Sequence, residues 1–251
     1  MKIHHVALAF VILAVLVRPS SASSIIIGSS GSNNAFPFGS SGLYLGEYQQ
    51  VYTAVDFSGS VLIDQVAFRS LNGFGNAGTL LSDTLTLSLG TTSASPSAPG
   101  TTYAGNKRPD LTTVFTGTVS ETLFGNGTFD FFINFSTPFL YNPTLGNLLF
   151  DVDVTTTLGR AAFDAGKSPD TGRLFNLGGN GAVTPGPNFG LVTRFDVTAV
   201  PEPATISLVG IGVLGMLVAK YRRRKVSTTG DMRHPRRLVK QNWHPVLRTE
   251  S

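Results

Sequence analysis

The sequence predicts an all-β protein, a single β-sandwich of jelly-roll type, on three observations. No segment keeps an apolar repeat of 3.6 residues over three helical turns. Several short segments alternate apolar and polar residues with a period of two, as half-buried strands do. Turns rich in glycine, proline and asparagine separate these segments. A closed barrel is the alternative arrangement of such strands.

The expected strands begin near residue 48 and continue to residue 198. The clearest alternation is at 83–90, where Leu85, Leu87 and Leu89 occupy every second position. In 128–135 one face is expected to carry Phe129, Phe131, Ile133 and Phe135, and the other face Phe132 and Asn134. The other strands are expected at 48–57, 61–69, 112–120, 147–155 and 190–198. The turns between strands are expected at 72–76, 95–100, 125–127 and 178–181.

The N-terminal segment 1–22 is predicted to be a signal peptide. A lysine and two histidines precede an apolar run that is too short for a clear membrane span. Ser20 and Ala22 fit the small residues of a signal-peptidase site, so cleavage is expected between Ala22 and Ser23. The exported β-sandwich would then occupy residues 23–199. An uncleaved N-terminal anchor is the alternative.

The C-terminal region carries three signals in a fixed order. A Pro-Glu-Pro motif, made of Pro201, Glu202 and Pro203, comes first. An uncharged, mostly apolar stretch follows at 204–219 and is predicted to be a membrane helix. A basic cluster then ends the region at residue 225, and it consists of Lys220, Arg222, Arg223, Arg224 and Lys225.

The physics of the bilayer fits this order. Sixteen helical residues span roughly 24 Å, which is short for a hydrocarbon core of about 30 Å. Basic side chains at the end of the stretch can snorkel to the interface, and they hold that end on the cytoplasmic side. The body of the protein then lies outside the inner membrane. Pro201 and Pro203 cannot continue a helix, so the chain just before the stretch stays extended.

The motif, apolar stretch and basic cluster together resemble the PEP-CTERM sorting signal of exported bacterial proteins. The resemblance implies that an exosortase, a membrane protease, is the partner and that it recognises Pro201, Glu202 and Pro203. It also implies brief anchoring in the inner membrane, followed by release to the cell surface or extracellular matrix of Gram-negative bacteria that make exopolysaccharide. An ordinary C-terminal anchor is the alternative.

The chain continues beyond the basic cluster, whereas proteins with this signal usually stop soon after it. The additional segment 226–251 contains five Lys and Arg residues and few apolar ones. It is therefore predicted to be a disordered, cytoplasmic tail.

The charge of the exported body differs from that of the whole chain, whose net charge is +4. Ten of the nineteen Lys and Arg residues lie at or after Lys220, and two more lie in segment 1–22. Between residues 23 and 200, seven basic residues stand against twelve acidic ones, which gives a net charge near −5. A nucleic-acid partner is therefore not expected.

The residue types of the body argue against most enzyme chemistry. The chain has no cysteine, and its four histidines, His4, His5, His234 and His244, lie outside residues 23–200. Serine–histidine catalysis and histidine-based zinc sites are therefore not expected there. Carboxylate chemistry of the glycosidase type remains open, because Asp151 and Asp153 share a strand face at roughly 7 Å. Alternating acidic residues on a solvated face produce the same pattern, so no catalytic residues are predicted.

Two binding hypotheses remain for the body. Structural calcium is compatible with Asp164, Asp170 and the loop at 167–172, although the sequence does not specify a ligand set and no cofactor or metal residue is predicted. Tyr48 and Tyr52 share a strand face, and Tyr44 would join them if that strand started earlier. These rings could stack against sugars. The predicted function is a non-enzymatic surface protein, and a membrane-tethered polysaccharide-binding module is the alternative.

Overall fold

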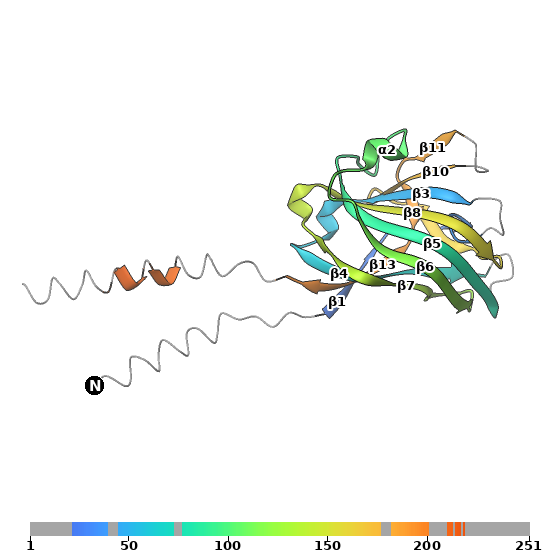
Figure 1. The fold of residues 1–251 in the computed structure, drawn as a ribbon, viewed down its shortest axis with the longest axis horizontal. Helices are drawn as coiled ribbons and strands as arrows, with labels where there is room; N and C mark the ends of the chain where they lie inside the picture. The colour runs from blue at the N-terminus through green and yellow to red at the C-terminus, as the bar shows by residue number, and fades with distance from the viewer. Residues whose placement is uncertain are drawn as a thin grey trace, which may run out of the picture. The chain divides into compact units, whose positions relative to one another are not determined.

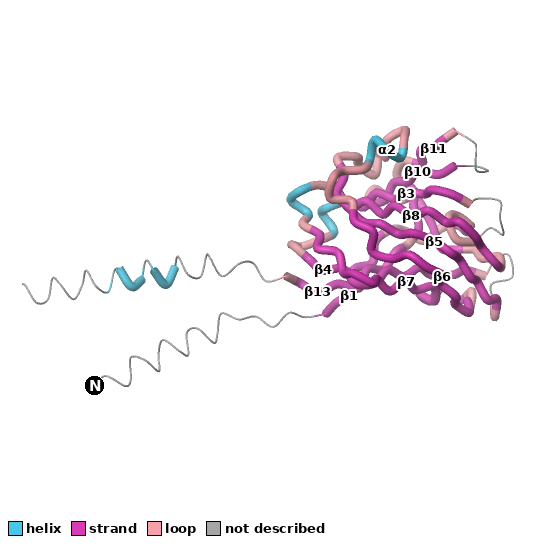
Figure 2. Tube along the Cα trace, in the orientation of Figure 1, coloured by secondary structure: helices cyan, strands magenta, loops and turns pink. Residues whose placement is uncertain are grey.

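The computed structural model describes residues 22–39, 45–72, 77–176, 182–200, 210–212, 214–216 and 218. Within residues 22–200 the protein is built from two antiparallel sheets (Figures 1 and 2). The predicted all-β fold with two sheets is confirmed.

The first sheet contains the strands that begin and end the body. Its order is β1-β13-β4-β9-β12, while β7 also pairs with β4 and β2 pairs with β9. These strands are β1 (Ala22–Ile27), β2 (Ser32–Asn34), β4 (Val61–Leu71), β7 (Asn126–Tyr141), β9 (Phe163–Lys167), β12 (Phe189–Leu191) and β13 (Thr193–Ala199).

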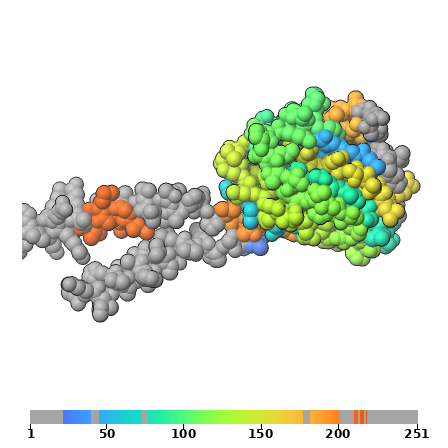
Figure 3. All heavy atoms as spheres, in the orientation of Figure 1, coloured from blue at the N-terminus to red at the C-terminus, as the bar shows by residue number. Residues whose placement is uncertain are grey.

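The second sheet has the order β11-β10-β3-β8-β5-β6. Its strands are β3 (Gly46–Tyr52), β5 (Thr79–Thr92), β6 (Thr112–Leu123), β8 (Asn147–Leu158), β10 (Thr171–Asn176) and β11 (Val183–Gly186). The described part of the body also contains three short helical turns: η1 (Ala54–Asp56), α2 (Tyr103–Asn106) and η2 (Pro143–Leu145). The segment 93–111 contains α2, which lies beside β3, and green atoms of the central part of the chain lie next to blue atoms on the face shown in Figure 3.

The core between the sheets is rich in phenylalanine. The ring of Phe38 lies 5.0 Å from that of Phe68 and 4.9 Å from that of Phe131, measured between ring centroids. Phe150, from the second sheet, lies 5.8 Å from Phe68. Tilted and edge-on pairs at these distances add to the free energy gained by burying the rings. The aromatic contacts therefore join the two sheets directly.

The alternation seen in the sequence is confirmed on the two clearest strands. Leu85, Leu87 and Leu89 of β5 are buried in the core. On β7, Ile133 is fully buried while its neighbour Asn134 is exposed. Binary patterning thus identified the inner face of β5 and, at Phe131 and Ile133, of β7. Phe129, expected on that same face, lies instead with Phe132 against Arg194, because the ladder between β4 and β7 shifts its register between Phe68 and Arg69.

Two predicted strands differ from the structure. The strand expected at 48–57 ends at Tyr52, because η1 follows and the N–H of Ala54 donates to Asn147 Oδ1 at 2.9 Å. The strand expected at 190–198 is two strands, β12 and β13. They are separated at Val192, whose N–H donates to the carbonyl of Asp164 in the register of the β12–β9 pair, whereas the chain from Thr193 onward pairs with β4.

The C-terminal unit, residues 203–251, is described only in small part. Residues 210–212, 214–216 and 218 are helical and exposed. Across the described residues, every helix falls short of the length and apolar character that a membrane crossing requires. The predicted leader before Ala22, most of the stretch 204–219, the basic cluster and the tail lie outside the described residues.

Candidate functional site

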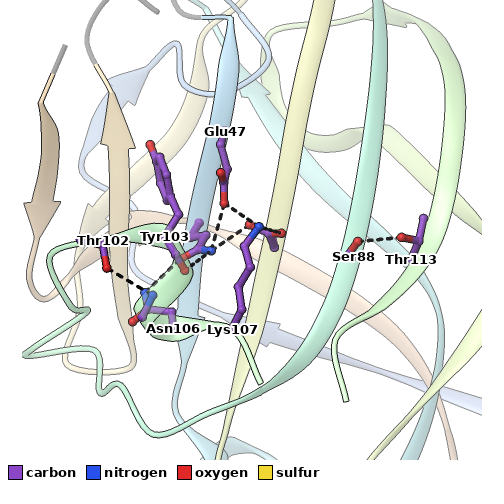
Figure 4. Close-up of polar contacts among 10 residues, drawn as sticks. Glu47, Ser88, Thr102, Tyr103, Asn106, Lys107 and Thr113 are labelled. Atoms are coloured by element: carbon purple, nitrogen blue, oxygen red, sulfur yellow. Dashed lines mark hydrogen bonds and ion pairs between the residues drawn. The ribbon is translucent and has the colours of Figure 1, made fainter. Parts of the chain in front are cut away.

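A cluster of interacting polar side chains lies on the outer face of the second sheet, under segment 93–111 (Figure 4). It combines side chains from β3, from β8 and from α2 with the residue after it. We call it the Lys107 cluster, and its members are Glu47, Gln49, Tyr103, Asn106, Lys107 and Asp151.

Lys107 is the centre of the cluster. Its ammonium nitrogen lies 2.9 Å from Glu47 Oε1 and 3.0 Å from Asp151 Oδ2. The two carboxylates come from neighbouring antiparallel strands, where Gln49 is opposite Asp151 and Glu47 is opposite Asp153. The lysine therefore connects segment 93–111 to β3 and β8.

Gln49 holds the cluster from below and is fully buried. Its Nε2 donates to Asp151 Oδ1 at 2.9 Å and to the carbonyl of Tyr103 at 3.1 Å. Its Oε1 accepts from Asn106 Nδ2 at 2.9 Å, and Asn106 also donates to the carbonyl of Pro99. These partners fix both ends of the amide, so Gln49 presents its N–H groups in one orientation.

The electrostatics of the cluster follow from partial burial. Loss of hydration raises the pKa of Glu47, and Asp151 beside it raises that pKa further against the opposing effect of Lys107. Burial lowers the pKa of Lys107, but its hydrogen bonds to Glu47 and Asp151 outweigh this and raise the pKa overall. The two carboxyl groups therefore favour the ammonium form of Lys107.

The pair of aspartates considered for glycoside hydrolysis does not share one environment. Asp151 is buried and is held by Gln49 and Lys107. Asp153 is exposed two residues further along β8. The neighbours of Asp151 could not be predicted from the sequence, because Glu47 and Lys107 approach it from distant parts of the chain.

The tyrosine platform considered for sugar binding is wrong for Tyr48 and Tyr52. Both side chains point into the core and are fully buried. Tyr48 donates its hydroxyl proton to Gln50 Oε1 at 2.7 Å, and burial raises the pKa of Tyr48 to about 12. The hydroxyl of Tyr52 is 2.7 Å from Thr193 Oγ1. Tyr44 lies outside the described residues.

A different aromatic surface is present on the first sheet. Phe129 and Phe132 of β7 are half-buried, and the guanidinium carbon of Arg194 lies 5.3 Å and 5.5 Å from their ring centroids. Arg69 lies 5.6 Å from the Phe129 ring. Both phenylalanines also line a shallow groove next to the exposed Phe124. We call Phe129, Phe132, Arg69 and Arg194 the Phe–Arg face.

The carboxylates considered for calcium have protein partners. Asp164 Oδ1 accepts from Ser30 Oγ at 2.8 Å, and Asp164 Oδ2 is 2.6 Å from the Arg69 guanidinium. Asp170 Oδ2 accepts from Ser168 Oγ at 3.2 Å. Over the ranges that the structure covers, no three His, Cys, Asp or Glu side chains gather as metal ligands would.

The expected processing positions lie where the folded body begins and ends. Ala22 and Ser23 are the first two residues of β1, where Ala22 is opposite Thr198 of β13. After β13, the N–H of Val200 donates to the carbonyl of Ser60 at 3.0 Å. Pro201, Glu202 and Pro203, together with the basic cluster at 220–225, lie outside the described residues.

Comparison with known proteins identifies this C-terminal region. Residues 199–224 match the PEP-CTERM protein-sorting motif. The match covers the Pro-Glu-Pro motif, the apolar stretch and most of the basic cluster, so the resemblance seen in the sequence is confirmed. The motif indicates exosortase-dependent sorting of an exported surface protein. No curated protein matches the chain.

Proposed function

Because residues 199–224 carry a PEP-CTERM sorting signal, we propose that an exosortase processes this chain near Pro201–Glu202–Pro203 and delivers its β-sandwich to the cell envelope or extracellular matrix. The sandwich then has a structural, non-enzymatic role among the exopolysaccharide of a Gram-negative bacterium. The match to the sorting motif is the observation that carries this proposal.

The end of the folded body supports processing at this point. The hydrogen bond from Val200 to Ser60 is the last one described before the motif. Pro201 and Pro203 have no N–H group and cannot extend the ladder of β13. A protease can therefore act on this segment without breaking the hydrogen bonds that pair β13 with β1 and β4.

The chemistry of the body supports a role without catalysis. Asp151 and the neighbouring Glu47 are both held in ion pairs with Lys107, and Asp153 is exposed two residues further along β8. A glycosidase needs two carboxyl groups that face one bound sugar. The body offers instead a compact, cysteine-free domain with a large phenylalanine core.

The experiment is an intact-mass measurement on the native protein from membrane and extracellular fractions. A released species that begins near Ser23 and ends near residues 201–203 is expected. Substitution Glu202→Ala should retain the protein in the membrane fraction, while Glu250→Ala, in the tail, should leave release unchanged. A wild-type protein that stays membrane-bound with residues 226–251 attached would show a plain anchored protein and would overturn the proposal.

Polysaccharide binding is the second candidate function, and the Phe–Arg face is the observation that favours it. Half-exposed rings can stack on the apolar faces of sugars, and guanidinium groups next to them can donate to hydroxyl or carboxylate oxygens. This surface is open on β7, unlike the buried Tyr48 and Tyr52.

Binding to a panel of purified neutral and acidic exopolysaccharides tests this candidate. Phe129→Ala combined with Phe132→Ala should weaken binding by at least about tenfold, the equivalent of one lost stacking contact. Leu145→Ala removes an exposed apolar side chain elsewhere, on η2, and should have no effect. A wild-type protein that binds none of the polysaccharides would contradict the candidate.

A further inference from the structure

The Lys107 cluster places an amine beside a carboxyl group that it could attack. Lys107 Nζ is 3.0 Å from Asp151 Oδ2, so the nitrogen is close to the carboxyl carbon to which that oxygen is bound. Near-attack arrangements have reacting atoms about 3–3.5 Å apart, so the nitrogen must move from its ion-pair position at Oδ2 onto the carbon; such pairs reach effective molarities of about 10⁵–10⁸ M. An effective molarity this far above the concentration of water can favour the amide over its hydrolysis.

Glu47 occupies the position of a proton carrier. Its Oε1 is 2.9 Å from Lys107 Nζ, and it lies on the strand next to Asp151. Partial burial makes this carboxyl group a better proton acceptor than an exposed glutamate, since its pKa is raised. Glu47 can therefore take a proton from the ammonium group and return it to an oxygen of Asp151.

Gln49 supplies a fixed donor to the other oxygen of Asp151. Its Nε2 donates to Asp151 Oδ1 at 2.9 Å, and the side chain is fully buried. Asn106 holds the opposite end of the amide in place. A preorganised N–H group at this oxygen would stabilise the negative charge that develops there when the carboxyl carbon is attacked.

From this arrangement we propose that Lys107 and Asp151 form an intramolecular amide cross-link, with Glu47 carrying protons and Gln49 stabilising the intermediate. The bond would join segment 93–111 covalently to β8. In a chain without cysteine, it would provide the kind of covalent closure that disulfides provide in other exported proteins.

The reaction balances without a co-reactant. One proton of the Lys107 ammonium group passes through Glu47 to Asp151 Oδ2, which leaves a neutral amine and a neutral carboxyl group. The nitrogen lone pair forms a bond to the Asp151 carboxyl carbon. A second proton then passes from the nitrogen through Glu47 to Oδ2, the bond from carbon to Oδ2 breaks, and one water molecule leaves. The ammonium and the carboxylate become one neutral amide, and Glu47 ends as it began.

The raised pKa of Lys107 sets the pace of this reaction. The neutral amine is a minor species, because the two carboxylates hold the ammonium form. The cross-link should therefore form slowly after folding and accumulate, since amide hydrolysis is slower still.

The test is the mass of the full-length protein after purification and prolonged incubation. Most of the wild-type protein should be lighter than its sequence requires by the mass of one water molecule. A proteolytic digest should contain one branched peptide that holds both Lys107 and Asp151, and trypsin should fail to cut after Lys107. Leader removal and C-terminal processing leave this branched peptide unchanged, so it tests the cross-link separately from sorting.

Variants separate the cross-link from the ion pair. Lys107→Arg keeps the positive charge, but its guanidinium group does not deprotonate in proteins, so the mass loss should disappear. Glu47→Gln should slow the mass loss at least about tenfold, which is the low end of the usual contribution of a proton-transferring group. Lys167→Arg and Asp153→Asn, which change an exposed lysine and an exposed aspartate, should behave as the wild type. A wild-type protein of full sequence mass, cut normally after Lys107, would leave an ion pair only and overturn the proposal.

Discussion

Ala22 and Thr198 lie opposite each other on the antiparallel strands β1 and β13, so the first and last strands of the folded body are hydrogen-bonded neighbours. On its other side β13 pairs with β4, from Thr193 to Ala199. The strand that leads into the sorting motif is therefore an interior strand of its sheet.

The contribution of β1 to stability should come from its inward-facing side chains. Ile27 is 2% exposed and belongs to the core, while its neighbour Ile26 is 57% exposed. Ile27→Ala should lower the free energy of unfolding by about 2–4 kcal/mol, measured by urea denaturation. Ile26→Ala is the matched control and should change it by less than about 0.5 kcal/mol. Equal effects of the two substitutions would show that β1 is not anchored as described.

Asp83 should make the stability of the body depend on pH. Its carboxyl group is fully buried on β5, and burial raises its pKa from 3.8 to about 7, although an interaction with the Thr157 side chain opposes the shift. Below about pH 4 the group is protonated in both the folded and the unfolded protein, so it has no effect. Between about pH 4 and pH 7 the carboxyl group is ionised in the unfolded chain but still protonated in the folded protein. The free energy of unfolding should therefore fall as the pH rises through this range.

Asp83→Asn should remove this pH dependence, because the amide does not ionise. Relative to the wild type, its free energy of unfolding should rise by about 2–4 kcal/mol between pH 4 and pH 8, since each unit of pKa shift corresponds to about 1.4 kcal/mol. Thermal or urea denaturation across this range gives the comparison, and the exposed Asp153→Asn serves as the control. A constant difference between wild type and Asp83→Asn would rule out the titration of Asp83.

Asp130 should be critical for the hairpin between β6 and β7. It is 4% exposed, its Oδ1 accepts from the N–H of Ser70 at 3.0 Å, and its Oδ2 accepts from the N–H of Phe124 at 2.7 Å. Asp130→Ala should cost about 3 kcal/mol or more, because it leaves buried donors unsatisfied. Asp64→Ala, at an exposed position on β4, should cost less than about 0.5 kcal/mol. A small effect at Asp130 would mean that water replaces the carboxylate without loss.

The hydroxyl of Tyr52 should contribute a modest amount across the core. It lies 2.7 Å from Thr193 Oγ1 and connects β3 of the second sheet to β13 of the first. Tyr52→Phe keeps the ring and should lower stability by about 1 kcal/mol. The double substitution with Thr193→Val should cost less than the sum of the two single ones, as expected for residues in contact. Additive effects in this double-mutant cycle would contradict the contact.

The parts of the fold that were predicted from the sequence depend on local alternation. Leu85, Leu87 and Leu89 show it because one side of β5 faces the core and the other faces water or polar partners. β9 shows none, since residues from Phe163 to Gly166 are all buried. A strand that is covered on both faces has no period of two to detect.

The Lys107 cluster was not predictable for a different reason. Lys107, Glu47 and Asp151 are far apart in the chain, and each is an ordinary charged residue in its local context. The prediction that Tyr48 and Tyr52 could be exposed was wrong, because their hydroxyl groups have hydrogen-bond partners inside the core. The contacts of the Lys107 cluster and of Tyr52 join residues far apart in the chain, which no local pattern contains, whereas Tyr48 bonds to Gln50 two residues away on the same strand face.

The interior position of β13 also determines when folding can finish. In a chain that is exported N-terminus first, β1 and β4 cross the membrane early. They cannot complete their pairing until β13, the strand that lies between them, has also crossed. The sheet closes only when residues 193–199 are outside, and the sorting signal starts at that same point in the sequence. The sandwich is therefore completed at nearly the same time as the sorting signal reaches the export machinery. A chain truncated before residue 193 would lack β13, and β1 and β4 would each have an unpaired edge.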